Sequence, residues 1–126
     1  MTTRTITLAT LLLCTAVPAF ADGELTLYSA RHYDTDERLS SDFEDATGIT
    51  INRIEGNADE LSARMQAEGI NSPADVLLTV DTSRLERAKD AGLLQSIDSA
   101  ILEERIPNNL QDSDNQWFGF SQRARV

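Results

Sequence analysis

The residues with the clearest chemical potential are His32 and Tyr33, which are adjacent in the segment Tyr28-Ser29-Ala30-Arg31-His32-Tyr33-Asp34. His32 is the only histidine of the chain, and Tyr33 is one of its two tyrosines. Imidazole is a good ligand for iron, zinc and copper, and a deprotonated phenol oxygen suits a hard, highly charged cation. A trivalent ion can drive that ionisation although the free phenol has a pKa near ~10. The alternative is a surface histidine beside a tyrosine that packs on its own helix, and the spacing alone leaves both interpretations open.

Three other groups of polar residues allow a binding role, and each also has a simpler structural interpretation. Glu55-Gly56-Asn57 either faces the same cleft or forms a turn that caps a helix. Asp81 is either a carboxylate ligand or a helix N-cap. Arg123 and Arg125, two apart on an expected strand, either hold an anion or lie on a solvated edge. The sequence has no Cys/His zinc spacing, nucleophile elbow or phosphate loop, so we expect a binding protein and not an enzyme.

Residues 1–21 have the pattern of a cleaved secretion signal. Arg4 precedes an apolar run that ends at Pro18, and Ala19-Phe20-Ala21 supplies the small residues that a signal peptidase accepts. The run is shorter than the roughly 20 apolar residues that a membrane-spanning helix needs. The residue before the only cysteine is too large for a lipoprotein motif. We therefore expect export, cleavage before Asp22, and no membrane anchor.

Composition limits the partners. The chain has 21 acidic and 11 basic residues, a net charge of −10, which loss of Arg4 with the signal would bring to −11. Such a surface repels nucleic acid and anionic lipid and suits a soluble protein that meets small cations, although an excess of acidic residues is usually a feature of solubility alone. Residues 22–126 suffice for one small domain with a single core.

The first strand–helix unit surrounds the His32-Tyr33 pair. Alternating residues 25–29 predict a strand. Acidic residues 34–37 suit the positive end of a helix dipole, which predicts a helix start. One face of that helix carries the apolar residues Leu39, Phe43 and Ala46. Gly48 predicts where the helix ends, because glycine is common just after the last helical residue.

Two more units repeat this order. Residues 49–54 predict a second strand, and Asn57 predicts the cap of a helix that ends at Gly69. The expected inner face of that helix is Ala58, Leu61 and Met65. The continuous apolar run 74–80 predicts a central parallel strand buried on both faces. A third helix, capped by Asp81, Thr82 or Ser83 and closed by Gly92, carries Leu85, Ala88 and Ala91.

The remaining residues give weaker signals: a short helix around 100–102, a polar loop at 108–116, and a last strand at 117–121. The alternation of strands and helices predicts an α/β fold, a three-layer αβα arrangement with a mostly parallel sheet. In such sheets ligands bind outside the carboxyl ends of the strands. Residues 29–33 and 79–82 follow strands, so we expect the site there.

Four segments resemble the periplasmic iron(III)-binding proteins of ABC transporters, which have the type II periplasmic-binding fold. They read LYSARHYDTD (27–36), EGNADEL (55–61), SPADVLLTVD (72–81) and WFGFSQRARV (117–126), in the order and spacing of the family. The resemblance implies a two-lobed clamshell of which residues 22–126 form the N-terminal α/β lobe, incomplete and truncated near the hinge strand. The second lobe and its pair of adjacent tyrosine ligands would be missing.

The resemblance also implies a function: a periplasmic solute-binding component of an ABC importer that binds ferric iron for uptake. His32 and Tyr33 match the ligands of the first lobe. Arg123 is the expected helper for a synergistic anion such as carbonate, whereas the place of a glutamate ligand in some members holds Val80, with Asp81 beside it. The expected partner is the membrane permease, with no nucleic acid, and the protein would be a monomer. One lobe holds half a site, so we expect weak iron binding and exposed apolar surface.

Other functions remain open from the sequence. The same fold binds other solutes, such as an oxyanion, a polyamine or another metal, and a truncated chain is also compatible with an inactive remnant. An α/β enzyme or a phosphate-accepting regulatory domain of flavodoxin type is a further alternative. The secretion signal is unfavourable for a cytoplasmic regulator, and the missing catalytic groups are unfavourable for an enzyme.

Overall fold

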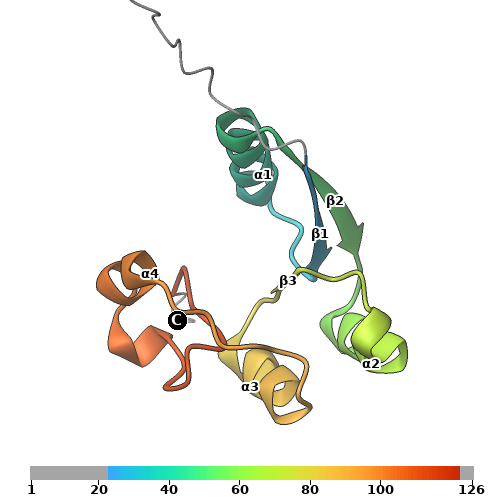
Figure 1. Ribbon diagram of the computed structural model, residues 1–126, viewed down its shortest axis with the longest axis vertical. Helices are drawn as coiled ribbons and strands as arrows, with labels where there is room; N and C mark the ends of the chain where they lie inside the picture. Colours follow the sequence, from blue (N-terminus) through green and yellow to red (C-terminus); the bar gives the residue numbers. More distant parts are fainter. Residues whose placement is uncertain (1–22, 123–126) are drawn as a thin grey trace, which may run out of the picture.

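Three parallel strands form the sheet of this protein. A computed structural model describes residues 23–122; the expected signal, residues 1–21, and Arg123 and Arg125 lie outside them. The strands are β1 (Gly23–Ser29), β2 (Ile49–Glu55) and β3 (Val76–Leu78), in the order β2-β1-β3 (Figure 1). Both neighbours of β1 run parallel to it. The parallel sheet that the sequence predicts is confirmed.

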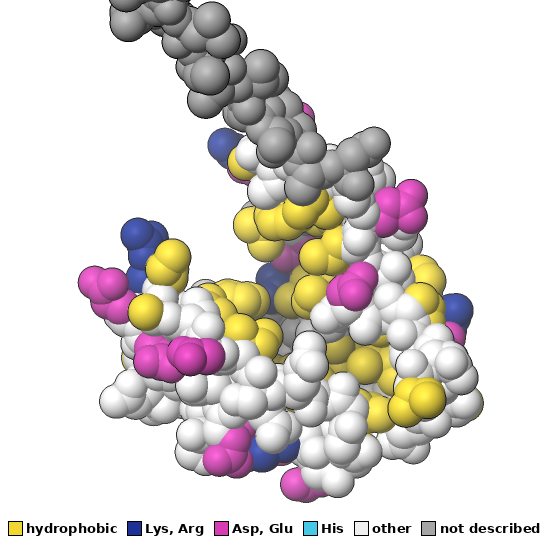
Figure 2. Space-filling model, viewed as in Figure 1, with side chains coloured by type: hydrophobic (Ala, Val, Ile, Leu, Met, Phe, Trp, Pro, Cys, Tyr) yellow, Lys and Arg dark blue, Asp and Glu magenta, His cyan; other side chains and the backbone are white. Residues whose placement is uncertain are grey.

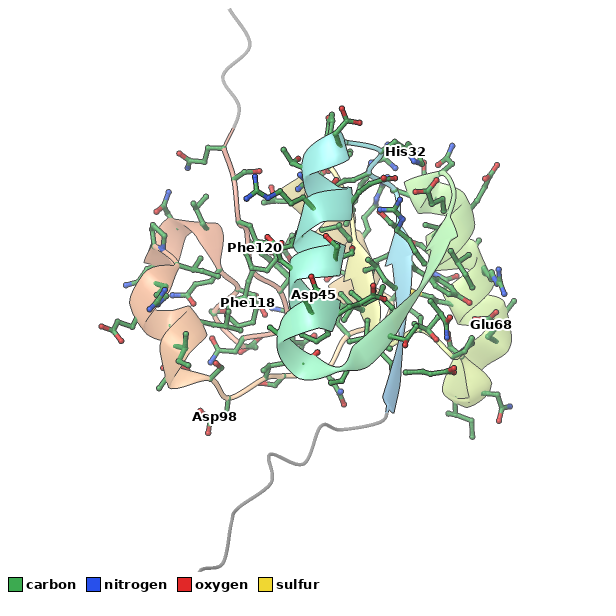
Figure 3. All side chains as sticks on the ribbon, turned by 90° about the horizontal axis from the view of Figure 1, so that it is seen from above. His32, Asp45, Glu68, Asp98, Phe118 and Phe120 are labelled. Atoms are coloured by element: carbon green, nitrogen blue, oxygen red, sulfur yellow. The ribbon has the colours of Figure 1, made fainter. Side chains whose placement is uncertain are left out.

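Helices cover both faces of this sheet. Figures 1 and 3 show α1 (Asp34–Thr47) and α2 (Ala58–Glu68) on opposite sides of β1 and β2. Two further helices, α3 (Thr82–Asp90) and α4 (Ala100–Arg105), and two 3-10 turns, η1 (Gly69–Asn71) and η2 (Asn108–Leu110), complete the described elements. None of the described helices combines the length and apolar character that crossing a membrane requires.

The core lies between β1 and α2. Tyr28, Leu61 and Met65 are its buried members, with Ile54 and Leu77 packed at its margin. The Asn57 side chain caps α2 by accepting a hydrogen bond of 2.9 Å from the Asp59 backbone N–H, as the sequence predicts. The expected inner face of this helix is confirmed in full, because Ala58, Leu61 and Met65 are all buried. This helix fixes the position of β1, the strand that leads to His32.

The helix α1 has the predicted bounds but not the predicted apolar face. It begins at Asp34 and ends before Gly48, whose φ of 73° is the left-handed conformation that glycine adopts at least cost. Leu39 is 64% exposed and Ala46 is exposed as well, whereas Phe43 is partly buried. The buried residue of this helix is Asp36, because its carboxylate forms an ion pair with Arg31.

The third strand differs from the expectation for residues 74–80. Only Val76–Leu78 forms a strand, and Val76 remains 43% exposed. Within the described residues β3 pairs with β1 alone, so it is an edge strand and β1 is the central one. A continuous apolar run does not distinguish the two positions, because strand order depends on pairing between distant segments.

The expected last strand at 117–121 is also wrong for the described residues, where Phe118 forms a single antiparallel bridge with Gln111. Residues 111–118 are held against α3 instead, because the Lys89 ammonium lies 2.6 Å from a carboxylate oxygen of Asp112 and the Trp117 indole N–H donates to Glu86 at 3.1 Å. The buried Asp112 carboxylate also accepts hydrogen bonds from the backbone N–H groups of Asp114 and Gln116. An ion pair and a turn therefore determine the conformation of residues 111–118. Neither produces a periodic pattern of apolar residues in the sequence.

A groove of about 900 Å³ runs along β3, α3 and residues 116–121. Figure 2 shows hydrophobic side chains gathered around the hollow on this face. Two of the large apolar residues that line it are far from buried: Val80 is 54% exposed and Phe120 is 68% exposed. The exposed apolar surface that we expected is present.

Candidate metal-binding loop

The loop from Ala30 to Tyr33 connects β1 to α1 at the carboxyl edge of the sheet. Its first residue is fixed by β3, because the Ala30 backbone N–H donates to the Leu78 carbonyl oxygen at 2.8 Å. The fully buried Ser29 hydroxyl donates to the Arg31 carbonyl oxygen at 3.0 Å and accepts from the Arg31 backbone N–H at 3.2 Å. These bonds close a tight serine turn, so the residues that follow leave the sheet in a defined direction.

His32 extends from this loop into solvent beside the end of β2. Figure 3 shows it at the edge of the sheet toward which the strands run. Its side chain is 60% exposed, and its Nδ1 atom lies 3.4 Å from an oxygen of the Glu55 carboxylate. Ser29 and Glu55 are paired in the sheet register, so the two strands end side by side. The imidazole is therefore accessible to a ligand and has a carboxylate on one side.

Tyr33 occupies the N-cap position of α1 and is 39% exposed. The Arg31 guanidinium lies over its ring, 5.3 Å from the ring centroid, which is a cation–π contact. Arg31 is itself held by the buried Asp36 through two contacts of 3.0 and 3.2 Å. This arrangement places the ring of Tyr33 against the ion pair of Arg31 and Asp36.

The second tyrosine does not share this accessibility. Tyr28 is fully buried, and its hydroxyl donates to the Glu68 carboxylate at 3.0 Å. Burial raises the pKa of the Tyr28 phenol, and the hydrogen bond to Glu68 adds to the effect. Arg64 completes the cluster, because it pairs with Glu68 at 2.7 Å and stacks over the Tyr28 ring. Of the two tyrosines, Tyr33 is therefore the exposed one.

The other candidates from the sequence have structural roles. The Asp81 carboxylate caps α3 by accepting from the Arg84 backbone N–H at 3.0 Å, and it also accepts from the Ser83 hydroxyl at 2.7 Å. The Ser83 hydrogen bond is the main reason that the pKa of Asp81 is lowered. Asn57 caps α2, whereas Glu55 faces His32. Arg123 lies outside the described residues.

The residue that the sequence did not assign is Arg53. Its Nε atom lies 3.0 Å from one oxygen of Glu55, and its guanidinium reaches Glu37 in the first turn of α1 at 2.8 Å. Because Glu55 ends a strand that is parallel to β1, the sequence allowed it to face the same cleft as His32, but it did not specify a contact between the two side chains. The partner Arg53 has no such signal, since the sequence does not reveal which arginine turns toward a given carboxylate.

The possible donors that this loop carries are therefore one imidazole and one phenol, with a carboxylate next to the imidazole. Among residues 23–122 no group of three or more His, Cys, Asp and Glu side chains is arranged to hold a metal ion. Two neighbouring donors from one loop occupy only part of the coordination sphere of a transition metal, and solvent or further groups fill the rest.

The chain is similar in sequence to known proteins whose names refer to iron. The chain is 55% identical to "Iron uptake protein A1" of Synechocystis over 103 residues, which are 82% of this chain and 29% of that protein. It is 31% identical to "Fe(3+)-binding periplasmic protein" of Serratia marcescens over 111 residues, 88% of this chain and 32% of that one. No protein-family model matches the chain.

Solved structures agree with these relatives. A Trichodesmium protein, described as "(IdiA) (FutA) in complex with iron and citrate ligands", superposes with a TM-score of 0.76 and 52% identity. The match covers 79% of this chain and 31% of the other. The chain thus spans about three-tenths of the length of the proteins that it matches. Its parallel sheet with helices on both faces is the part of the fold that these comparisons support.

Proposed function

This chain is a homologue of bacterial ferric iron-binding proteins over about three-tenths of their length, and from this premise we propose that it supplies one wall of a ferric-ion site. His32 and Tyr33 are the protein ligands of this wall. One observation carries the proposal: these two residues are consecutive in the chain, both are exposed, and they lie in the loop at the carboxyl edge of a parallel sheet. The names of the relatives favour iron over an oxyanion or a polyamine as the solute.

The chemistry of the two side chains fits this cargo. Iron(III) is a hard ion that prefers anionic oxygen, and coordination would convert the Tyr33 phenol to a phenolate. The neutral imidazole of His32 would supply a nitrogen ligand. Two ligands on an open surface leave positions for water, so binding to this chain alone is expected to be weak. Arg123 is proposed to help hold a synergistic anion such as carbonate.

The cellular role follows from the same relatives. We propose that the protein acts in the periplasm, reached through removal of residues 1–21, and passes the ion to the membrane permease of an ABC importer. A binding role of this kind needs no catalytic group, and the described site offers none of the constellations that covalent catalysis uses.

Equilibrium binding of iron tests the proposal. The full chain is titrated with ferric nitrilotriacetate, and the protein-bound iron is measured after rapid separation. Saturable weak binding is expected, and His32→Ala is expected to reduce the association constant at least about tenfold. Arg38→Ala, which removes an exposed cation on α1 whose side chain is 84% exposed, serves as the control and should bind as the unmodified chain does. Equal binding by His32→Ala and the unmodified chain would refute the proposal.

A further inference from the structure

We propose that Glu55 is a positioning residue for His32, which holds the imidazole in the tautomer that presents Nε2 to the ion. This inference rests on the proposed function, because it concerns how one of the proposed ligands is oriented. Its starting observation is the 3.4 Å separation between His32 Nδ1 and one oxygen of Glu55. A neutral imidazole carries its proton on one nitrogen only, and the partner of the other nitrogen decides which one.

The carboxylate itself is held from the opposite side. Arg53 Nε lies 3.0 Å from the second oxygen of Glu55, so one oxygen is paired with the guanidinium and the other faces the imidazole. Arg53 is only 23% exposed at its side chain and is fixed by Glu37 in α1 at 2.8 Å. The oxygen of Glu55 that Arg53 does not contact is thus the one nearest to His32.

The backbone explains why these groups meet. Ser29 ends β1 opposite Glu55 in the parallel register, and the Gly56 backbone N–H donates to the Ser29 carbonyl oxygen at 3.2 Å. The two strand ends are therefore joined at the point where the chain turns toward His32. A carboxylate or carbonyl that accepts from the non-coordinating nitrogen of a histidine is the usual support of a metal-ligating imidazole.

The expected consequence is a preformed ligand. With Nδ1–H directed at Glu55, the lone pair of Nε2 points away from the carboxylate toward solvent. The negative charge beside Nδ1–H also makes Nε2 a stronger donor to a cation. Isolated imidazole divides its proton between both nitrogens, so removal of the Glu55 charge leaves part of the population in the tautomer that cannot bind through Nε2.

Nitrogen-detected NMR of His32 tests this inference without iron, and the chain contains no other histidine that would overlap. In the unmodified full chain at neutral pH we expect the Nδ1–H tautomer to dominate. Glu55→Gln keeps the size of the side chain and is expected to shift the equilibrium toward Nε2–H. Glu104→Gln removes the same charge from an exposed position on α4 and should leave the tautomer unchanged. A dominant Nε2–H form in the unmodified chain would overturn the inference.

Binding of gallium(III), a diamagnetic ion of the same charge, provides the second readout. The ion is expected to attach to Nε2 while the Nδ1–H signal persists, and Glu55→Gln is expected to weaken binding by about tenfold. Arg53→Gln frees the carboxylate without deleting it and should give a smaller loss. Attachment of the ion through Nδ1, or to the Glu55 carboxylate itself, would contradict a positioning role.

The two proposals fail in different ways. If His32 shows the Nδ1–H tautomer and loses it in Glu55→Gln, but the unmodified chain binds neither gallium nor iron, the proposed function is wrong and the pairing of the two residues is supported. If the ion binds and Glu55→Gln changes neither the tautomer nor the affinity, the proposed function stands and the positioning role is refuted. Circular dichroism of each variant confirms that the comparison is made between folded chains.

Discussion

Arg31 and Asp36 form a two-point ion pair, with contacts of 3.0 and 3.2 Å, that joins the candidate metal-binding loop to the first turn of α1. Both side chains are largely shielded, at 19% and 8% exposure. Because Arg31 also lies over the Tyr33 ring, this pair fixes the surroundings of one proposed ligand while Glu55 fixes those of the other. The loop is thus supported by side chains of α1 and of β2.

The first prediction concerns this ion pair. Asp36→Ala removes the carboxylate and leaves a shielded guanidinium without its partner, so the free energy of unfolding is expected to fall by about 2 kcal/mol. The measurement is equilibrium unfolding in urea. Asp42→Ala is the matched control, because its pair with Arg38 spans 3.7 Å between side chains that are 84% and 67% exposed. That variant should change the free energy by less than about 0.5 kcal/mol. Equal effects of the two variants would show that the Arg31 pair has no special role.

The second prediction separates the two tyrosines by stability. Tyr28→Phe deletes a buried hydroxyl that donates to Glu68, and the free energy of unfolding is expected to fall by about 1 kcal/mol. Tyr33→Phe, at a position that is 39% exposed, should cost less. The urea midpoints of both variants provide the comparison. A larger loss in Tyr33→Phe than in Tyr28→Phe would contradict the assignment of Tyr28 to the core.

The third prediction is a dependence of stability on pH. Hydrogen bonding to Lys89 holds the pKa of Asp112 below its ordinary value. A carboxyl group with a lowered pKa in the folded state stabilises the fold above its unfolded pKa of about 3.9, and this contribution disappears as the pH falls through the folded value. Thermal melts between pH 7 and pH 3 should therefore show a decline that Asp112→Asn reduces.

The second carboxylate that contacts Lys89 provides a control for this effect. Asp114 also contacts Lys89, at 2.9 Å, but its side chain is 63% exposed. Asp114→Asn should retain most of the decline in melting temperature between pH 7 and pH 3. If Asp114→Asn abolished the decline and Asp112→Asn did not, the charge that stabilises the fold would be that of the exposed Asp114, and the prediction would be wrong.

The fourth prediction concerns the apolar groove along β3. An environment-sensitive dye such as anilinonaphthalene sulfonate is expected to bind the folded chain there, since apolar patches of this extent attract apolar ligands. Phe120→Ser should reduce the fluorescence with little change in stability, because this side chain is 68% exposed. Leu39→Ser, on α1 and outside the groove lining, is the control for a general loss of apolar surface. Equal reductions in both variants would refute a specific groove.

Local signals explain which parts of the fold the sequence could predict. The helix α2 was predicted with its cap, its inner face and its end because Asn57, Leu61 and Gly69 act within a few residues of one another. The position of β3 at the edge was not predictable, since Val76 and its neighbours have the same apolar character in an edge or a central strand. The segment around Asp112 was missed because a lysine 23 residues away determines it.

In the candidate site, too, local features were predictable and contacts between distant residues were not. His32 and Tyr33 were identified by residue type and by their place after a strand, and the structure places both at the carboxyl edge of the sheet; their role as ligands remains a proposal. The contact between His32 and Glu55 depends on the register of two parallel strands, which the sequence does not state. Arg53 was missed because its importance comes only from its two carboxylate partners.

The most direct test of the central claim is visible absorption of the iron-loaded chain in the two tyrosine variants. A phenolate bound to iron(III) produces a charge-transfer band, which gives a red colour. We expect this band to appear when the unmodified chain is mixed with ferric nitrilotriacetate, to persist in Tyr28→Phe, and to vanish in Tyr33→Phe. A band of unchanged intensity in Tyr33→Phe would show that Tyr33 is not an iron ligand.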